Sequence, residues 1–153
     1  MDPVVARAMA KWPNVPAVYG WLALDRRGNW LIKGERIGNA ALREFIARNY
    51  AADDAGRWYF QNGPQRVYVH LAYTPLVVHY EGEALVDHCG RPFAARVAYL
   101  DDEGSVLMAD ERGIALLDDR DLGRFAEAAP SLQRITRSEV LARFRFVPQP
   151  QPG

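Results

Sequence analysis

The fold is decided by the stretch Gly56-Arg57-Trp58-Tyr59-Phe60-Gln61-Asn62-Gly63-Pro64-Gln65-Arg66-Val67-Tyr68-Val69-His70-Leu71. Two runs rich in aromatic and β-branched residues flank the breaker cluster at 62–65, a pattern typical of a β-hairpin. Pro64 presets φ for a turn and Gly63 tolerates positive φ, so we expect a loop of about four residues around a type I turn. Apolar and polar residues alternate over 67–71, which predicts that one face of this strand is core.

The same local signals place the other elements. Asn39 is the expected N-cap of an amphipathic helix that ends near Asn49. Helices are expected at 4–11, at 39–49 and after an acidic cap at 118, 119 or 121, and strands at 17–24, 29–33, 75–80, 94–100 and 105–109. Residues 83–92 are weakly patterned with a turn at 88–92, and 138–142 fit a helical turn, although Phe144 and Phe146 alternate like a strand.

These elements predict an α+β fold. We expect largely antiparallel β-hairpins with two main helices packed on the sheet, forming a single globular domain over residues 1–147. The Pro-Gln-Pro-Gln-Pro-Gly end at 148–153 is expected to be an extended, disordered tail.

An internal relation suggests a diverged β-β-α duplication with pseudo-repeats at 16–49 and 92–127. A shift of 76 residues aligns Asp25 with Asp101 and Gly28 with Gly104, and a capped helix follows each hairpin. Convergence stays open as the alternative, because Asp and Gly recur in hairpin turns of every kind.

Composition limits the classes of function. The 153 residues are 49% hydrophobic and 25% charged, with a formal net charge of zero. A neutral chain lacks the cationic excess that nucleic-acid or anionic-membrane binding needs. No apolar run is long enough to span a bilayer, and the N-terminus lacks a signal pattern. Cys89 is the single cysteine, which suits a reducing compartment, so a cytoplasmic location is expected.

Few residues offer metal or nucleophile chemistry. His70, His79, His88 and Cys89, with Asp87, are the candidate ligands, but no paired zinc spacing occurs. The phosphate-binding glycine motifs are also missing. We therefore expect no metal, no cofactor and no catalytic residue. The alternative is a small hydrolase or ligand-binding enzyme that uses His70, His79 or Cys89 in a pocket.

The tip of the central hairpin carries the candidate binding residues. Its side-chain amides and guanidinium supply more hydrogen-bonding capacity than a plain connector requires, and a cation and an indole lie at its base. The residues are Arg57, Trp58, Gln61, Asn62, Gln65 and Arg66. The alternative is that these groups only satisfy the local backbone and water.

The run at 56–67, Gly-Arg-Trp-Tyr-Phe-Gln-Asn-Gly-Pro-Gln-Arg-Val, together with Leu-Asp-Asp-Arg-Asp-Leu at 117–122, resembles an uncharacterised family of short bacterial proteins. The resemblance spans roughly residues 16–126. It implies a free-standing bacterial domain and lends no activity, cofactor or catalytic residue. The leading hypothesis is a non-catalytic binding or assembly module whose partner is itself or another protein. It rests on the absence of a catalytic constellation and on the many aromatic residues of the short strands.

Overall fold

The strands of the computed structural model, which describes residues 1–128 and 131–152, form two six-stranded sheets. Each sheet belongs to one of two compact units of the chain. Unit 1 comprises 1–25, 29–72 and the residues from Val147 on, and unit 2 comprises 26–28 and 73–146. The α+β class with mostly antiparallel strands is confirmed. The strands are divided between two sheets, where the sequence analysis expected one.

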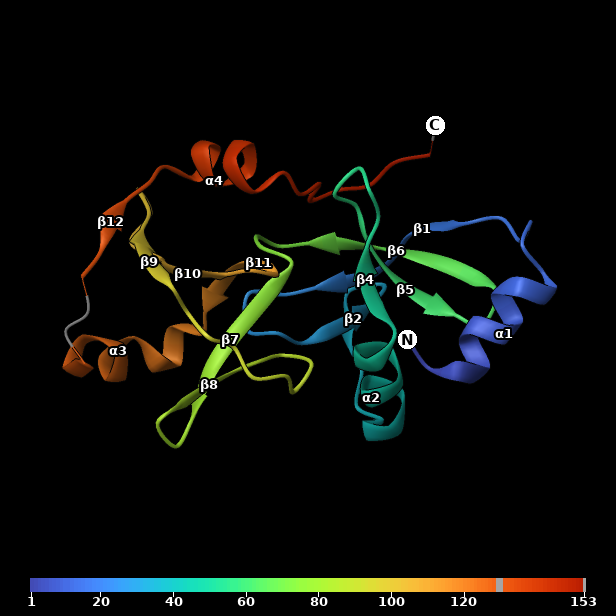
Figure 1. Ribbon diagram of the computed structural model, residues 1–153, viewed down its shortest axis with the longest axis horizontal. Coiled ribbons are helices and arrows are strands. Elements are labelled where there is room, and N and C mark those ends of the chain that lie inside the picture. Colours follow the sequence, from blue (N-terminus) through green and yellow to red (C-terminus); the bar gives the residue numbers. More distant parts are fainter. Residues whose placement is uncertain (129–130, 153) are drawn as a thin grey trace. The chain divides into compact units, whose positions relative to one another are not determined.

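Unit 1 contains two helices and six strands (Figure 1). They are α1 (Pro3–Lys11), β1 (Val18–Leu24), β2 (Trp30–Ile32), β3 (Glu35–Arg36), α2 (Ala40–Arg48), β4 (Tyr50–Ala52), β5 (Trp58–Asn62) and β6 (Gln65–Leu71). The strand order is β3-β2-β1-β6-β5-β4, and β1 and β6 are the parallel pair between two antiparallel halves. The central hairpin predicted from sequence is the pair β5–β6.

The turn of this hairpin is shorter than predicted. Asn62 pairs directly with Gln65, so the loop is the two residues Gly63 and Pro64 and not four around a type I turn. Gly63 has φ 57°, the positive value that two-residue hairpin loops need at their first position. The shorter loop places the side chains of Asn62 and Gln65 opposite each other on one face of the sheet.

Both helices of unit 1 begin where the sequence predicts. The side chain of Asn39 caps α2 by accepting a hydrogen bond from Leu42 N at 2.9 Å. Asp2 precedes α1, but its carboxylate accepts instead from Arg48 Nε at 3.2 Å and Asn49 Nδ2 at 3.3 Å. These bonds tie the start of α1 to the end of α2.

Unit 2 contains the remaining elements. They are β7 (Leu76–Glu81), β8 (Ala84–Asp87), β9 (Val97–Leu100), β10 (Val106–Asp110), β11 (Gly113–Leu117), the 3₁₀ helix η1 (Asp119–Asp121), α3 (Leu122–Ala128), β12 (Gln133–Arg134) and α4 (Arg137–Phe144). The strand order is β12-β9-β10-β11-β7-β8, with parallel pairs β11/β7 and β12/β9. Residues 138–142 are helical, because Thr136 and Glu139 form a capping box at the start of α4.

One turn occurs four times among the residues that the structure describes. In each case an Asp N–H donates to the carbonyl of the fourth residue after it, at 2.8–3.0 Å, and the Asp carboxylate accepts from that residue's N–H at 2.7–3.0 Å. The four acids are Asp25, Asp53, Asp87 and Asp101. The glycine three residues after each Asp has φ of 82° or 83°, a conformation that other L-residues rarely adopt.

The first hairpin of each pseudo-repeat has the same register. Leu24 pairs with Trp30 as Leu100 pairs with Val106, so β1–β2 and β9–β10 agree under the shift of 76. The agreement ends at the next strand, where β2–β3 and β10–β11 differ in register. The same turn also begins at Asp53 and at Asp87, and the shift of 76 residues does not relate these two positions. The duplication therefore stays a prediction.

No helix within residues 1–128 and 131–152 has the length and apolar character to cross a membrane. At the C-terminal end, Leu71 N donates to Pro148 O at 2.7 Å and Pro150 is buried. Disorder of the tail at 148–153 stays a prediction, and Gly153 lies outside the described residues.

Candidate functional site

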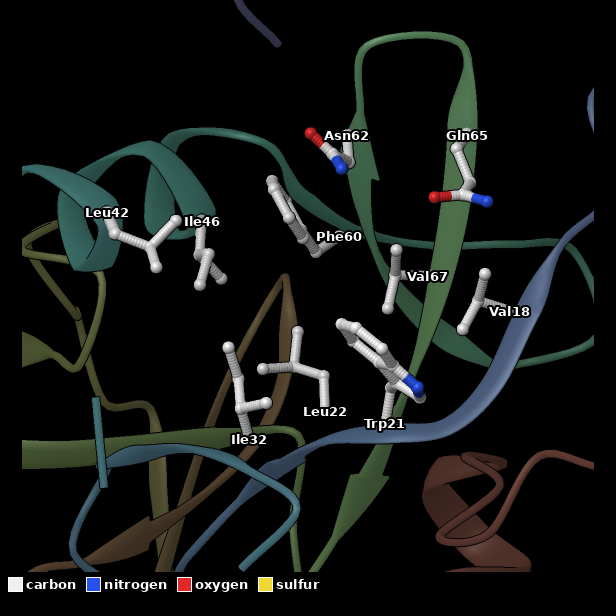
Figure 2. Close-up of a pocket in the computed structure, with 10 residues that line it drawn as sticks. All are labelled: Val18, Trp21, Leu22, Ile32, Leu42, Ile46, Phe60, Asn62, Gln65 and Val67. Carbon is white, nitrogen blue, oxygen red and sulfur yellow. The ribbon is translucent and has the colours of Figure 1, made fainter. Parts of the chain in front are cut away.

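An apolar groove of about 380 Å³ lies in unit 1 between α2 and the sheet (Figure 2). We call it the unit 1 groove. Its lining comes from β1, β2, α2, β5 and β6. The residues are Val18, Trp21, Leu22, Ile32, Leu42, Ile46, Phe60, Asn62, Gln65 and Val67.

A β-bulge in β1 shapes one side of the groove. The register between β1 and β6 shifts between Val18 and Leu22, and Gly20 within this interval has φ 75°. The bulge interrupts the strand's alternation, so the neighbouring residues Trp21 and Leu22 both line the groove. Trp21 is 52% exposed, so part of its indole is accessible at the groove.

The opposite side of the groove is the apolar face of α2. Leu42 and Ile46 are four residues apart and therefore lie on the same face of the helix. Ile46 is fully buried, whereas Leu42 is 37% exposed at the rim. Phe60 of β5 is buried, with its ring 5.5 Å from that of Phe45 on α2. The groove therefore has buried residues in its floor and an exposed rim.

The hairpin end of the groove is polar. Figure 2 shows Asn62 and Gln65 beside each other near the β5–β6 turn, away from Leu22 and Ile32. Within residues 1–128 and 131–152, neither side-chain amide makes a hydrogen bond to another protein group. None of the lining residues is charged. The groove therefore offers two neutral amides at one end of an apolar surface.

The six residues predicted to bind divide between the two faces of the hairpin. Asn62 and Gln65 line the groove. Arg57 and Arg66 lie on the other face, where their guanidinium groups stand over the rings of Tyr68 at 4.6 Å and Tyr59 at 3.9 Å. The structure therefore brings only two of the six together at the groove.

The remaining two predicted residues are largely packed. Gln61 is buried, with Nε2 donating to Gly63 O at 3.0 Å and Oε1 without a hydrogen-bond partner among the described residues. The ring of Trp58 packs on that of Tyr50 at 4.8 Å. Both side chains therefore make contacts inside unit 1. Whether any of the six binds a ligand stays a prediction.

On the far face of the same sheet, Asp53 forms a small ionic network. Its carboxylate accepts from Arg57 Nε at 2.8 Å and from the Tyr68 hydroxyl at 3.1 Å. Burial alone would raise the pKa of Asp53, but hydrogen bonds from Arg57, Tyr68 and Ala55 outweigh it and lower the pKa below its ordinary value. This network holds the turn at the base of β5.

The candidate catalytic residues are separated. His70 belongs to the sheet of unit 1 and His79 to that of unit 2, so the two residues are on strands of different sheets. His79 and His88 do line one hollow of about 440 Å³ in unit 2. There His88 Nδ1 accepts from Val77 N at 3.2 Å, and His79 Nε2 lies 3.2 Å from a Glu81 carboxylate oxygen.

The acids of this hollow are held by the protein itself. Asp121 accepts from Tyr80 N at 2.8 Å, and Asp118 lies 2.6 Å from Arg120 Nη2. Burial would raise the pKa of Asp118, but its hydrogen bonds and charge interaction with Arg120 lower it. Within residues 1–128 and 131–152 no three His, Cys, Asp or Glu side chains gather as metal ligands would. That the protein holds no metal stays a prediction.

Cys89 is the remaining candidate nucleophile. Burial, with a smaller effect of the Asp87 carboxylate, raises the pKa of its thiol to about 12. A catalytic thiol has its pKa lowered instead, because the thiolate is the reactive form. Asp87 itself is buried and pairs with Arg112 at 2.8 Å, so its charge serves the turn at 87–91.

Unit 2 has a groove in the place that corresponds to the unit 1 groove. It has a volume of about 440 Å³ and is lined by Val97 and Ala98 of β9, Met108 of β10 and Phe125 of α3. The shift of 76 relates Trp21, Leu22 and Ile32 to the first three of these residues. Tyr80, Arg96 and Gln133 add polar groups to the lining. We call it the unit 2 groove.

A family model matches nearly the whole sequence. The model DUF2944, described as "Protein of unknown function (DUF2946)", matches residues 1–151. The chain belongs to this family. The expected membership of an uncharacterised family is thus confirmed, and the DUF2944 match extends beyond the residues 16–126 that carried the resemblance.

Two solved structures are similar to this DUF2944 chain. A DUF1285 family protein from Silicibacter pomeroyi DSS-3 is 18% identical with a TM-score of 0.55, and the match covers 83% of this chain and 84% of that one. A DUF1285 family protein from Shewanella baltica OS155 is 16% identical with a TM-score of 0.48, covering 69% and 90% of the two chains. The first likeness shows a shared fold and no function. No curated protein matches the chain.

Most groove residues of the DUF2944 chain were missed from sequence. The amphipathic helix at 39–49 and the tip residues Asn62 and Gln65 were predicted, but the apolar segments that complete the groove are distant from them in the sequence. One signal was available. Gly20 within an otherwise regular strand marks a bulge or a close backbone approach.

Proposed function

We propose that the protein is a non-catalytic binding module and that the unit 1 groove holds a small, largely apolar ligand. The observation that carries this proposal is the lining of the groove. It combines eight apolar side chains with the amides of Asn62 and Gln65 and contains no titratable group. Ligand sites of roughly 300–1,000 Å³ have this composition, with few polar groups that set orientation.

The lack of titratable groups in the lining favours binding over catalysis. General acid–base or nucleophilic catalysis needs such a group within reach of the substrate. The alternative, a hydrolase or ligand-binding enzyme using His70, His79 or Cys89, has weaker support. The thiol of Cys89 has a raised pKa, and His79 and His88 contact structural groups of unit 2.

The proposal includes a bacterial cytoplasmic location and an assembly role, with the chain itself or another protein as partner. The single cysteine and the open rim at Leu42 and Trp21 support it. Light scattering over a concentration series tests self-association. A strict monomer that also recovers no partner in pull-downs would remove the assembly role and leave ligand binding.

Ligand binding is tested with a variant whose larger side chain fills part of the groove and with a matched control variant. Leu42→Trp enlarges a side chain at the groove rim, and Leu132→Trp makes the same change at a similarly exposed leucine of unit 2 that does not line the groove. Both variants should unfold within about 0.5 kcal/mol of the wild type, as is usual for surface substitutions.

Saturable binding of the neutral dye Nile red, measured by fluorescence, should weaken at least about tenfold in Leu42→Trp, which corresponds to about 1.4 kcal/mol. Leu132→Trp should bind as the wild type does. Absence of saturable binding to the wild type, or equal binding by both variants, would contradict the proposal.

A further inference from the structure

We infer that the ligand of the unit 1 groove is an aliphatic amide, with its chain along the apolar lining and its amide group between Asn62 and Gln65. This inference rests on the proposed function and adds the chemical class of the ligand. Three features of the groove lead to it: the shape of the apolar part, the chemistry of the two amides, and the absence of charge from the lining.

The apolar part suits an unbranched chain. From the hairpin end, the lining continues over Val67 and Phe60 to Leu22 and Ile32, with Leu42 and Ile46 of α2 alongside (Figure 2). Each methylene that such a surface removes from water contributes about 0.8 kcal/mol. A volume of about 380 Å³ is that of a small-molecule site, which favours a discrete ligand as the occupant.

The polar end is complementary to an amide. Asn62 and Gln65 face each other across the turn, and each side chain has one carbonyl acceptor and an NH₂ donor. A ligand amide carries the same pair of functions, so it can donate to one side chain and accept from the other. Because neither amide makes a hydrogen bond to a protein group in the described residues, both are free to act.

The absence of charge in the lining selects against a carboxylate. Burying an ionised carboxylate without a cationic partner costs far more free energy than burying a neutral amide. One cation beside a lining residue, Lys33, is exposed, with its Nζ 5.2 Å from the centre of the Trp21 ring, and it does not line the groove. A neutral head group therefore fits better than the corresponding acid.

Calorimetric titration of the full chain with matched ligands tests the inference. Octanamide should bind, octanoate at pH 7 should bind at least tenfold more weakly, and hexanamide should bind about fifteenfold more weakly because two methylenes are missing. Equal affinity for octanamide and octanoate would overturn the inference, as would tighter binding of the acid.

Variants of the two amide residues test where the amide head group of the ligand binds. Gln65→Met and Asn62→Leu keep the approximate side-chain size and remove the hydrogen bonds, so each should weaken octanamide about fivefold and narrow the gap to octanoate. The control is Arg66→Met on the same strand, whose side chain lies on the opposite face and should leave the affinity unchanged. Octanamide affinity that is unchanged in both groove variants would contradict the inference.

The experiments distinguish failure of the proposed ligand class from failure of the proposed binding function. If Nile red binds in the groove but octanamide is not preferred, the ligand class is wrong and the binding function stands. If neither Nile red nor any aliphatic ligand binds, both are wrong. If light scattering shows a dimer that Leu42→Trp dissociates while octanamide does not bind, a second copy of the chain covers the groove and the ligand inference is overturned.

Discussion

Each of the two units contains a hairpin of the same register, and the side chains around the hairpin differ. In unit 1 the pair β1–β2 carries Trp21, Leu22 and Ile32 into a groove, and in unit 2 the pair β9–β10 carries Val97, Ala98 and Met108 into the corresponding one. The registers of the two hairpins coincide. Two hairpins of the same register therefore carry two different surfaces.

The difference in lining is chemical. The unit 1 groove has an exposed indole and two amides as its distinctive groups, whereas the unit 2 groove includes the guanidinium of Arg96 and the hydroxyl of Tyr80. Function must thus be argued from the side chains of each groove and not from the shared fold. The unit 1 groove is the better candidate for an apolar ligand because its lining has no charged group.

The largest expected effect tests the turn that recurs in both units. Asp87→Ala should cost about 3 kcal/mol of unfolding free energy, because it leaves two backbone N–H groups of a partly buried turn without their acceptor and removes a buried partner of Arg112. Asp53→Ala in unit 1 should cost about 2 kcal/mol, since its site is less buried and water can replace some bonds. Urea unfolding measures both.

The pH dependence of the unfolding free energy tests the Asp53 network separately. The pKa of Asp53 is lower in the folded chain than the ordinary value of 3.8, so its contribution is fully present above that pH and is lost as pH falls through the folded pKa. The stability difference between wild type and Asp53→Ala should therefore shrink on acidification from pH 7 to pH 3. A difference that stays constant over this range would contradict the assigned network.

The next prediction exchanges Trp21 of the unit 1 groove and Val97 of the unit 2 groove. Trp21→Val gives unit 1 the residue found at the corresponding place in unit 2 and should weaken Nile red binding about tenfold, because a half-buried indole contributes contact area worth about 1.4 kcal/mol. Val97→Trp, the reverse exchange, should leave binding at the unit 1 groove unchanged. Fluorescence titration measures both, and equal weakening by the two variants would show that the dye does not report on the unit 1 groove.

Local signals made most of the fold predictable. The aromatic run at 56–71, the cap at Asn39 and the Asp-x-x-Gly turns are each specified by neighbouring residues, and each is present in the structure. The strands β8 and β11 were missed because they are short and are stabilised by pairing with β7, which a local pattern does not report. The four-residue loop was wrong for a related reason, since strand pairing continues to Asn62 and Gln65.

The candidate site was less predictable than the fold. The groove joins Trp21, Leu42 and Phe60, which come from three separate segments, and the bulge at Gly20 breaks the alternation that normally assigns strand residues to faces. Alternation does hold in β6, where neighbouring residues point to opposite faces. The six tip residues therefore do not form one surface, although the sequence analysis treated them as one.

The smallest expected effect separates the two faces of the hairpin tip. Gln65→Ala removes a side chain that makes no protein hydrogen bond in the described residues, so the melting temperature should be nearly unchanged. Arg66→Ala removes the guanidinium over Tyr59 and should cost about 0.5–1 kcal/mol, the usual value for an exposed cation–π contact. Differential scanning calorimetry measures the stabilities, and light scattering measures self-association.

The double variant Gln65→Ala/Arg66→Ala combines changes on opposite faces, so the single variants carry the decision. If the groove is the binding surface, ligand binding or self-association should fall in Gln65→Ala and persist in Arg66→Ala. The reverse result would place the binding surface on the face of Arg57 and Arg66, where the rings of Tyr59 and Tyr68 already support two cations. If both single variants and the double variant bind as the wild type does, the tip serves only as a turn, and the polar end of the groove has no part in recognition.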